Sequence, residues 1–166
     1  EAHSWVGVDL HNIGHAFYKG EFYDSALYYM LLAEPIYDST FNQKSTQKAN
    51  AYRNIGHVYR KKDECDKALN YYQKAEIIYE EAIPNSKSNA IIKALIAKMF
   101  LCRENYNDAI KGLEIAENLY NENLPKEDKE YTFLYRDFAK TYFGLNLFQK
   151  AKAYQIKNNR LVKKYH

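Results

Sequence analysis

The feature that most constrains this chain is an internal repeat with a period of 41 to 42 residues. Residues 11–33 align without a gap on residues 53–75, and residues 97–116 and 139–158 fit the same pattern as a third and a fourth copy. Self-similarity at such a period is typical of a solenoid, in which each unit buries its apolar surface by stacking on its neighbours. The sequence therefore predicts a repeat array.

Each copy carries a small residue and, about twelve positions later, an alanine. The small residues are Gly14, Gly56, Ala97 and Ala139, and the alanines are Ala26, Ala68, Ala109 and Ala151. A bulky residue lies one position before the small residue and another lies three positions after it, which is the spacing of one helical stripe. A short polar turn divides each copy. We therefore expect two helices per copy, which cross closely at the small residues.

The fold class that we expect is all-α, an α-α superhelix of four helix-turn-helix repeats with about eight helices. The chain has six glycines and three prolines, which is little material for the turns of a β protein. A single array is predicted over residues 1–166, with repeats at approximately 4–42, 43–84, 85–126 and 127–166. The predicted helices lie at about 4–19, 22–38, 44–61, 64–82, 87–103, 106–122, 129–144 and 147–164. Pro35 should kink or end the second of them.

This arrangement of small, aromatic and alanine positions resembles the tetratricopeptide repeat family over nearly the whole chain. The common unit of that family has ~34 residues, so the longer spacing implies that each second helix is about two turns longer. Units of this length are similar to those of kinesin light chains and of bacterial peptide-responsive regulators. The resemblance implies a module that binds a protein or a peptide.

The fourth copy departs from the pattern. Gln155 and Asn158 stand where earlier copies have a large residue and an alanine. Since terminal repeats need a polar outer face, one interpretation is that this copy caps the array. The alternative is a face that continues into sequence outside this chain.

In a solenoid of this kind the first helix of each pair lines the concave surface. The positions three and two before the small residue, and one and four after it, predict a lining in which five of sixteen residues are Lys or Arg and one is acidic. The candidate ligand-binding residues are His11, Asn12, His15, Arg53, Asn54, His57, Arg60, Lys98, Arg136 and Lys140. A side-chain amide both donates to and accepts from one peptide unit, and guanidinium and ammonium groups bind carboxylates. The predicted ligand is therefore an extended, acidic polypeptide segment. The alternative is a wall that is polar only for solubility.

Three histidines could approach one another, because His11 and His15 share a helical face and His57 is the repeat equivalent of His15. The glutamate of the hydrolytic HExxH motif is absent between the first two, which favours groove-lining histidines over a metal site. No glycine-rich phosphate loop, nucleophile elbow or Cys-x-x-Cys pair occurs in the sequence. We therefore expect no catalytic residues, no cofactor and no enzymatic activity.

Our leading hypothesis is a module that binds a protein or peptide on its concave face. One alternative is the sensory or regulatory domain of a larger bacterial signalling or transcription-regulating protein, and another is a structural scaffold or oligomerisation spacer. The net charge of +3 is too small to predict nucleic-acid binding, and no apolar run reaches the ~18 residues of a spanning helix. The chain begins at Glu1 rather than Met, which is typical of an excised domain or a processed protein. We expect a cytoplasmic location.

Overall fold

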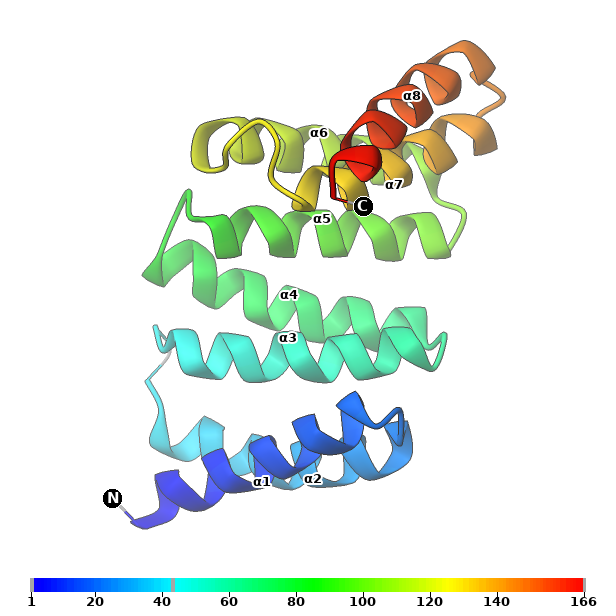
Figure 1. Cartoon of the computed structure of the whole chain (residues 1–166). Coiled ribbons are helices and arrows are strands. Elements are labelled where there is room, and N and C mark those ends of the chain that lie inside the picture. The colour runs from blue at the N-terminus through cyan, green and yellow to red at the C-terminus, as the bar shows by residue number, and fades with distance from the viewer. Residues whose placement is uncertain (1, 43, 166) are drawn as a thin grey trace. The chain divides into compact units, whose positions relative to one another are not determined.

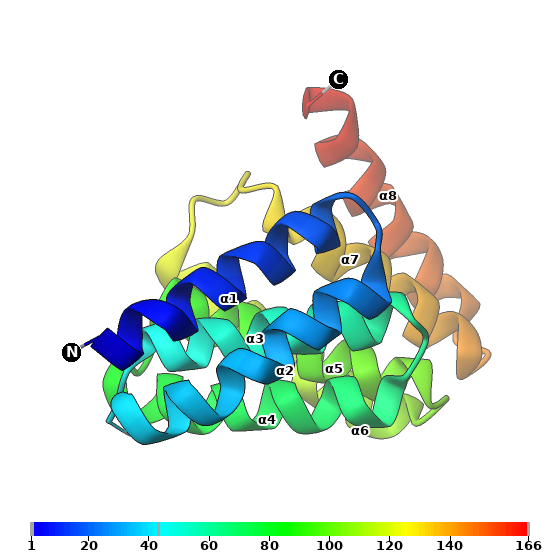
Figure 2. The ribbon, with the colours of Figure 1, turned by 90° about the horizontal axis from the view of Figure 1, so that it is seen from below.

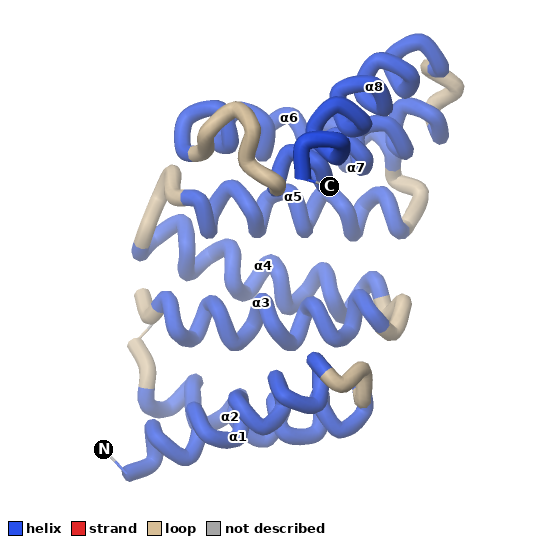
Figure 3. Tube along the Cα trace, in the orientation of Figure 1, coloured by secondary structure: helices blue, strands red, loops and turns tan. Residues whose placement is uncertain are grey.

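The computed structural model describes residues 2–42 and 44–165, and within these residues every regular element is an α-helix (Figure 1, Figure 3). The helices are α1 (Ala2–Lys19), α2 (Tyr23–Thr40), α3 (Thr46–Lys61), α4 (Cys65–Ala82), α5 (Lys87–Cys102), α6 (Tyr106–Asn123), α7 (Glu130–Gly144) and α8 (Phe148–Tyr165). The predicted all-α class and the eight predicted helices are confirmed, with boundaries that agree within two residues. None of the described helices is long and apolar enough to cross a membrane.

The helices pair in chain order, α1 with α2, α3 with α4, α5 with α6 and α7 with α8. They form two compact units, Glu1–Pro84 (unit 1, with α1 to α4) and Asn85–His166 (unit 2, with α5 to α8). Inside each unit the second helix of the first pair packs on the first helix of the second pair, α2 on α3 and α6 on α7 (Figure 2). Each unit is thus two stacked hairpins. A single array over residues 1–166 stays a prediction.

The same turn joins the two helices of every hairpin. Glu21, Asp63, Glu104 and Asn146 have positive φ angles of 64°, 58°, 56° and 60°. In the first turn the amide of Phe22 donates to the Phe17 carbonyl at 3.0 Å and that of Glu21 to the Tyr18 carbonyl at 3.1 Å, and the other turns repeat both bonds. This pair of bonds around one left-handed residue is a Schellman motif, which satisfies carbonyls at the end of the first helix. The repeat therefore extends to the backbone.

The small residues lie where the sequence predicts, at close helix crossings. Gly14 and Gly56 are buried, and Ala26 and Ala68 are both 0% exposed. A Cβ atom on Gly14 would lie 2.9 Å from the carbonyl oxygen of Ala26, so α1 and α2 touch through their backbones. At Gly56 the space that glycine leaves is filled by the ring of Tyr72, 2.6 Å from the position of a Cβ atom.

Pro35 does not end its helix, since α2 continues to Thr40. Of the two outcomes expected at Pro35, an end of the helix is therefore wrong. The Pro35 side chain is exposed, and on that side of the helix a carbonyl without its amide partner can bind water.

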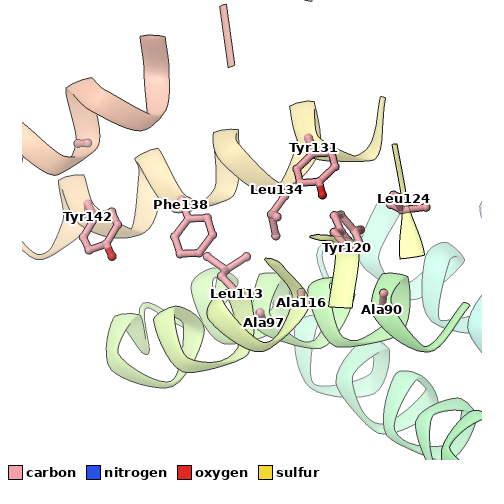
Figure 4. Packing of buried hydrophobic residues seen from close by; sticks show 11 residues of the cluster. Ala90, Ala97, Leu113, Ala116, Tyr120, Leu124, Tyr131, Leu134, Phe138 and Tyr142 are labelled. Atoms are coloured by element: carbon pink, nitrogen blue, oxygen red, sulfur yellow. The ribbon is translucent and has the colours of Figure 1, made fainter. Parts of the chain in front are cut away.

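Unit 2 has a core of alanines and large apolar or aromatic side chains (Figure 4). Leu113, Tyr120, Leu134 and Phe138 are each at most 2% exposed and come from α6 and α7. Phe138 also stacks on Tyr154 of α8, with 4.4 Å between ring centroids. The α6–α7 contact therefore continues into the final hairpin.

Replacement of Gly56 by leucine should destabilise unit 1 by about 1–3 kcal/mol or more, because the new side chain overlaps the buried Tyr72 ring. Urea unfolding followed by circular dichroism measures the loss. Ala16→Leu, at an exposed position of α1, is the control and should change the free energy of unfolding by less than about 0.5 kcal/mol. Equal effects of the two substitutions would contradict the close crossing.

Candidate functional site

Each unit holds part of the predicted lining. Unit 1 places His11, Asn12 and His15 on α1 and Arg53, Asn54, His57 and Arg60 on α3, and unit 2 places Lys98 on α5 and Arg136 and Lys140 on α7. Within unit 1, α1 and α3 contact each other, as α5 and α7 do within unit 2. The predicted residues of each unit therefore come from two first helices that contact each other.

His11 lies inside unit 1, with 8% of its surface exposed. Its ring meets Tyr37 edge-on, at 5.8 Å between centroids, and its Nε2 lies 3.0 Å from the Nδ2 of Asn54. Because an amide NH2 group only donates, Asn54 donates and His11 Nε2 accepts. His11 thus joins α1, α2 and α3, and the ring does not present itself to a ligand.

Burial, with a smaller contribution from the nearby His15, lowers the pKa of His11 to about 4. The buried ring is therefore neutral at pH 7. Its Nδ1 has no hydrogen-bond partner among the described residues. In unit 1 the ring holds Asn54, and a role of His11 in ligand binding stays a prediction.

Asn12 and Asn54 are repeat equivalents but lie in different surroundings. Asn12 is exposed, whereas Asn54 is half-buried and bound to His11. In unit 2 the equivalent residue, Asp137, also reaches the preceding first helix, since its carboxylate lies 3.5 Å from Nζ of Lys98. This position therefore ties neighbouring first helices together, and Asn12 alone of these three side chains is exposed for a ligand.

The hydroxyl of Tyr72 is the polar centre of unit 1. His57 Nδ1 lies 2.8 Å from it. Burial raises the pKa of Tyr72, and the positive charge of Arg60 opposes that rise, so the hydroxyl stays neutral and holds the His57 side chain.

His15 and Arg53 border this centre. His15 is exposed, and its ring centroid lies 6.3 Å from that of Tyr18. Tyr18 in turn is close enough to affect the pKa of the Tyr72 hydroxyl. The positive charge of Arg53 also acts on this hydroxyl. We call the surface formed by Asn12, His15, Arg53, His57 and Arg60 the first-helix face of unit 1.

Neither arginine of this face forms an ion pair with a carboxylate of the described residues. The described cations of unit 1 that do form ion pairs are lysines. The pairs are Lys48 with Asp38, Lys62 with Asp24, Lys67 with Glu64 and Lys74 with Glu34. Arg53 and Arg60 are half-buried, and the buried Nε of Arg60 lacks a hydrogen-bond partner in the part of the chain that the structure describes. The face therefore holds two positive charges without an ion-pair partner among the described carboxylates of unit 1.

In unit 2 two of the three corresponding cations lie beside one acid. Asp137 is 5% exposed and lies 3.5 Å from Lys98 and 3.7 Å from Nε of Arg136. Arg136 also lies over the Phe133 ring, 5.3 Å from its centroid. Lys140 is exposed. The structure thus brings Lys98 and Arg136 together around an aspartate.

Sequence reasoning did not select Tyr72 as part of the site. The sequence does contain a signal for it: Tyr72 occupies a position of the repeat at which the first and third copies have the apolar residues Met30 and Leu113. A tyrosine at a core position brings a hydroxyl that must find a partner.

Among the described residues, no three His, Cys, Asp or Glu side chains gather as metal ligands.

The burial of His11 predicts a pH-dependent stability. The unfolded chain binds a proton at this histidine below about pH 6.5 whereas the folded chain does not until about pH 4, so stability should fall between these values and be complete above them. Relative to His11→Gln, the wild-type chain should lose up to about 3 kcal/mol over this range. Urea unfolding at several pH values measures the loss.

His15→Gln, at the exposed neighbour, is the control and should keep most of the wild-type pH dependence, because burial is the larger cause of the lowered His11 pKa. An identical pH profile for the wild-type chain and His11→Gln would show that the folded chain protonates His11 as readily as the unfolded chain does.

Comparisons with known proteins agree with this architecture. Residues 9–81 match the family model of the tetratricopeptide repeat. No curated protein matches the chain in sequence. BtubC (BKLC) from P. vanneervenii matches in structure with a TM-score of 0.84 and 15% identity, over 96% of this chain and 64% of that protein.

Two further solved structures are similar. The putative kinesin light chain repeats of Podosopora anserina match with a TM-score of 0.77 and 12% identity, over 96% of this chain and 76% of that one. The Rap conjugation gene regulator of the plasmid pLS20 matches with a TM-score of 0.77 and 18% identity, over 91% of this chain and 41% of that one. This chain therefore spans less than two thirds of BtubC and of the Rap regulator. Residues 9–81 belong to the tetratricopeptide repeat family, and the rest of the described chain continues the same fold of consecutive helical hairpins.

Proposed function

We propose that this chain is a binding module whose first-helix face of unit 1 holds an extended, carboxylate-bearing polypeptide segment. The observation that carries the proposal is the pair of half-buried arginines, Arg53 and Arg60, without an ion-pair partner among the described residues. Partly buried guanidinium groups form strong, often bidentate bonds with carboxylates. A ligand carboxylate would supply the partner that unit 1 lacks.

The surroundings of the two arginines suit a peptide. Asn12 is exposed on α1, and its amide can both donate to and accept from the backbone of an extended segment. Arg53 and Arg60 are half-buried, so their side chains have less freedom to lose on binding than fully exposed ones. In unit 2 Asp137 already faces Lys98 and Arg136, so we assign the recognition of acidic groups to unit 1.

The comparisons support this proposal. The structure of the Rap regulator of pLS20 is a complex with the Phr* peptide, and that of another Rap protein is a complex with the competence and sporulation factor. Since these proteins are at most 18% identical to this chain, they support the class of ligand and not its sequence. We infer binding without catalysis.

A second candidate is the sensory part of a larger regulator. The observation in its favour is that the chain covers only 41% of the Rap regulator while matching it over 91% of its own length. In this function, ligand binding changes the arrangement of the hairpins and so acts on a further domain. A ligand-dependent change in the sedimentation coefficient of the chain would favour it, and an unchanged coefficient would favour simple binding.

The proposal is tested with two sets of fluorescent, terminally blocked peptides, one rich in Asp and Glu and one with Asn and Gln in their place. The acidic peptides should bind more tightly, and Arg53→Gln/Arg60→Gln should weaken their binding by about tenfold or more, because hydrogen bonds to charged groups contribute about 1.5–3 kcal/mol. Fluorescence anisotropy measures the affinities.

The matched control is Lys44→Gln/Lys61→Gln, which removes the same net charge at two exposed positions of unit 1. It should leave the affinity within about twofold, since surface charges contribute little. Equal binding of acidic and amide peptides, or equal losses in the two double variants, would contradict a specific carboxylate site.

A further inference from the structure

Unit 1 has a second surface that exposes large apolar side chains to solvent. It lies on the side of α1 and α2 that faces away from α3. In Figure 2, α1 and α2 lie nearest the viewer, with α3 and α4 behind them. Val6 is 50% exposed, Ile13 42%, Phe22 65%, Tyr28 62% and Leu32 44%. We call these five residues, together with Phe17 and Tyr29, the open face.

The repeat shows what kind of structure covers such a face. Forty-two residues after Ile13 lies Ile55, which is 1% exposed because α2 packs on α3. The ring pair also recurs, since Phe17 stacks on Tyr29 at 5.4 Å and Tyr59 stacks on Tyr71 at 5.5 Å. The first hairpin therefore presents the same stacked rings and the same isoleucine that receive a helix in the second hairpin.

The open face is also more apolar than its counterpart. The positions of Val6, Phe22, Tyr28 and Leu32 are occupied in the second hairpin by Lys48, Glu64, Asn70 and Lys74. Of these four, Lys48 and Lys74 pair with Asp38 and Glu34 of α2, so two polar residues of an internal joint are large apolar residues here. A contiguous apolar surface of this kind marks a site of interaction.

The hydrogen bonds of the internal joint define the chemistry of the occupant further. On α2, Asp38 binds Lys48 and the Tyr52 hydroxyl, and the open face has Val6 and Leu10 at those two positions. Asp38 itself is exposed. A carboxylate in the same place on the open face would lie beside two apolar side chains without a donor, whereas an apolar residue there would contact both.

The place of Glu34 is different. Its carboxylate accepts from the Tyr71 hydroxyl and from Lys74, both at 2.8 Å. The open face keeps the tyrosine, as Tyr29, and replaces the lysine by Leu32. The Tyr29 hydroxyl has no partner within the described residues, so it can donate to one acceptor on the occupant. The same bond recurs in unit 2, where the Tyr154 hydroxyl donates to Glu117 at 3.5 Å.

We propose that the open face docks one amphipathic helix, supplied from outside residues 1–166. This helix carries a hydrogen-bond acceptor opposite Tyr29 and, four positions later, an apolar residue where α2 has Asp38. The chain's own terminal helix does not fit, because α8 has Lys163 at the position of Asp38, where the open face requires an apolar residue. Head-to-tail stacking of a second copy would place Lys163 against Val6 and Leu10.

The test supplies the helix by fusion, which gives it a high effective concentration. A second copy of residues 23–45 replaces residues 1–3, so that it joins Ser4 as residues 23–45 join Thr46. One fusion keeps the acid at position 38 of the added copy and the other carries Asp38→Leu there, while both keep the acid at position 34. The leucine fusion should raise the Tm above that of the unfused chain by about 5 °C or more, and above that of the acidic fusion.

Ile13→Glu is the matched control, because a charge at this exposed position should hardly change the unfused chain but should abolish the gain in the leucine fusion. The same Tm for both fusions would overturn the chemistry assigned to the helix, and no gain in either would overturn helix docking. Sedimentation equilibrium of the unfused chain tests whether the open face binds a second copy of this chain instead. A dimer that Ile13→Glu dissociates would assign the face to that second copy and overturn the proposal.

Discussion

A hairpin of two amphipathic helices has more apolar surface than it can bury by itself, and this constraint determines the rest of the structure. In unit 1 the surface of the first hairpin is covered on one side by the second, through α2 and α3. The tyrosine donors Tyr52 and Tyr71, with Lys48 and Lys74, give the acids of α2 their partners. Burial of apolar area drives this joint, and the paired polar groups remove the penalty that unpaired carboxylates would bring.

The same position of the repeat has opposite roles in structure and in binding. Asn54 and Asp137 are used to connect neighbouring first helices, to His11 and to Lys98, while Asn12 is exposed. The charges differ in the same way, since Asp137 lies beside Lys98 and Arg136 in unit 2, while no described carboxylate of unit 1 forms an ion pair with Arg53 or Arg60. We therefore propose the first-helix face of unit 1 as the part of the expected basic wall that binds an acidic ligand.

The sequence was sufficient for the helices, their pairing and the close crossings, because these depend on spacings that recur in every copy, such as Gly14 with Ala26. It was insufficient for Pro35, because whether a helix tolerates proline depends on whether the affected carbonyl can reach water. It was also insufficient for His11, since spacing along one helix does not show that a ring turns toward Tyr37 and Asn54. Among the sixteen residues of the predicted concave lining, Asp137 is the one acid. Only the geometry shows that it lies beside two of the cations, Lys98 and Arg136.

The central claim is that each hairpin depends on a neighbour to cover its apolar surface. Amide hydrogen exchange of the whole chain tests this most directly, because protection reports the free energy of local opening. The account predicts that the amides of α1, which has a neighbour on one side only within unit 1, exchange faster than those of α3, which lies between α2 and α4. Equal protection of α1 and α3 would contradict it.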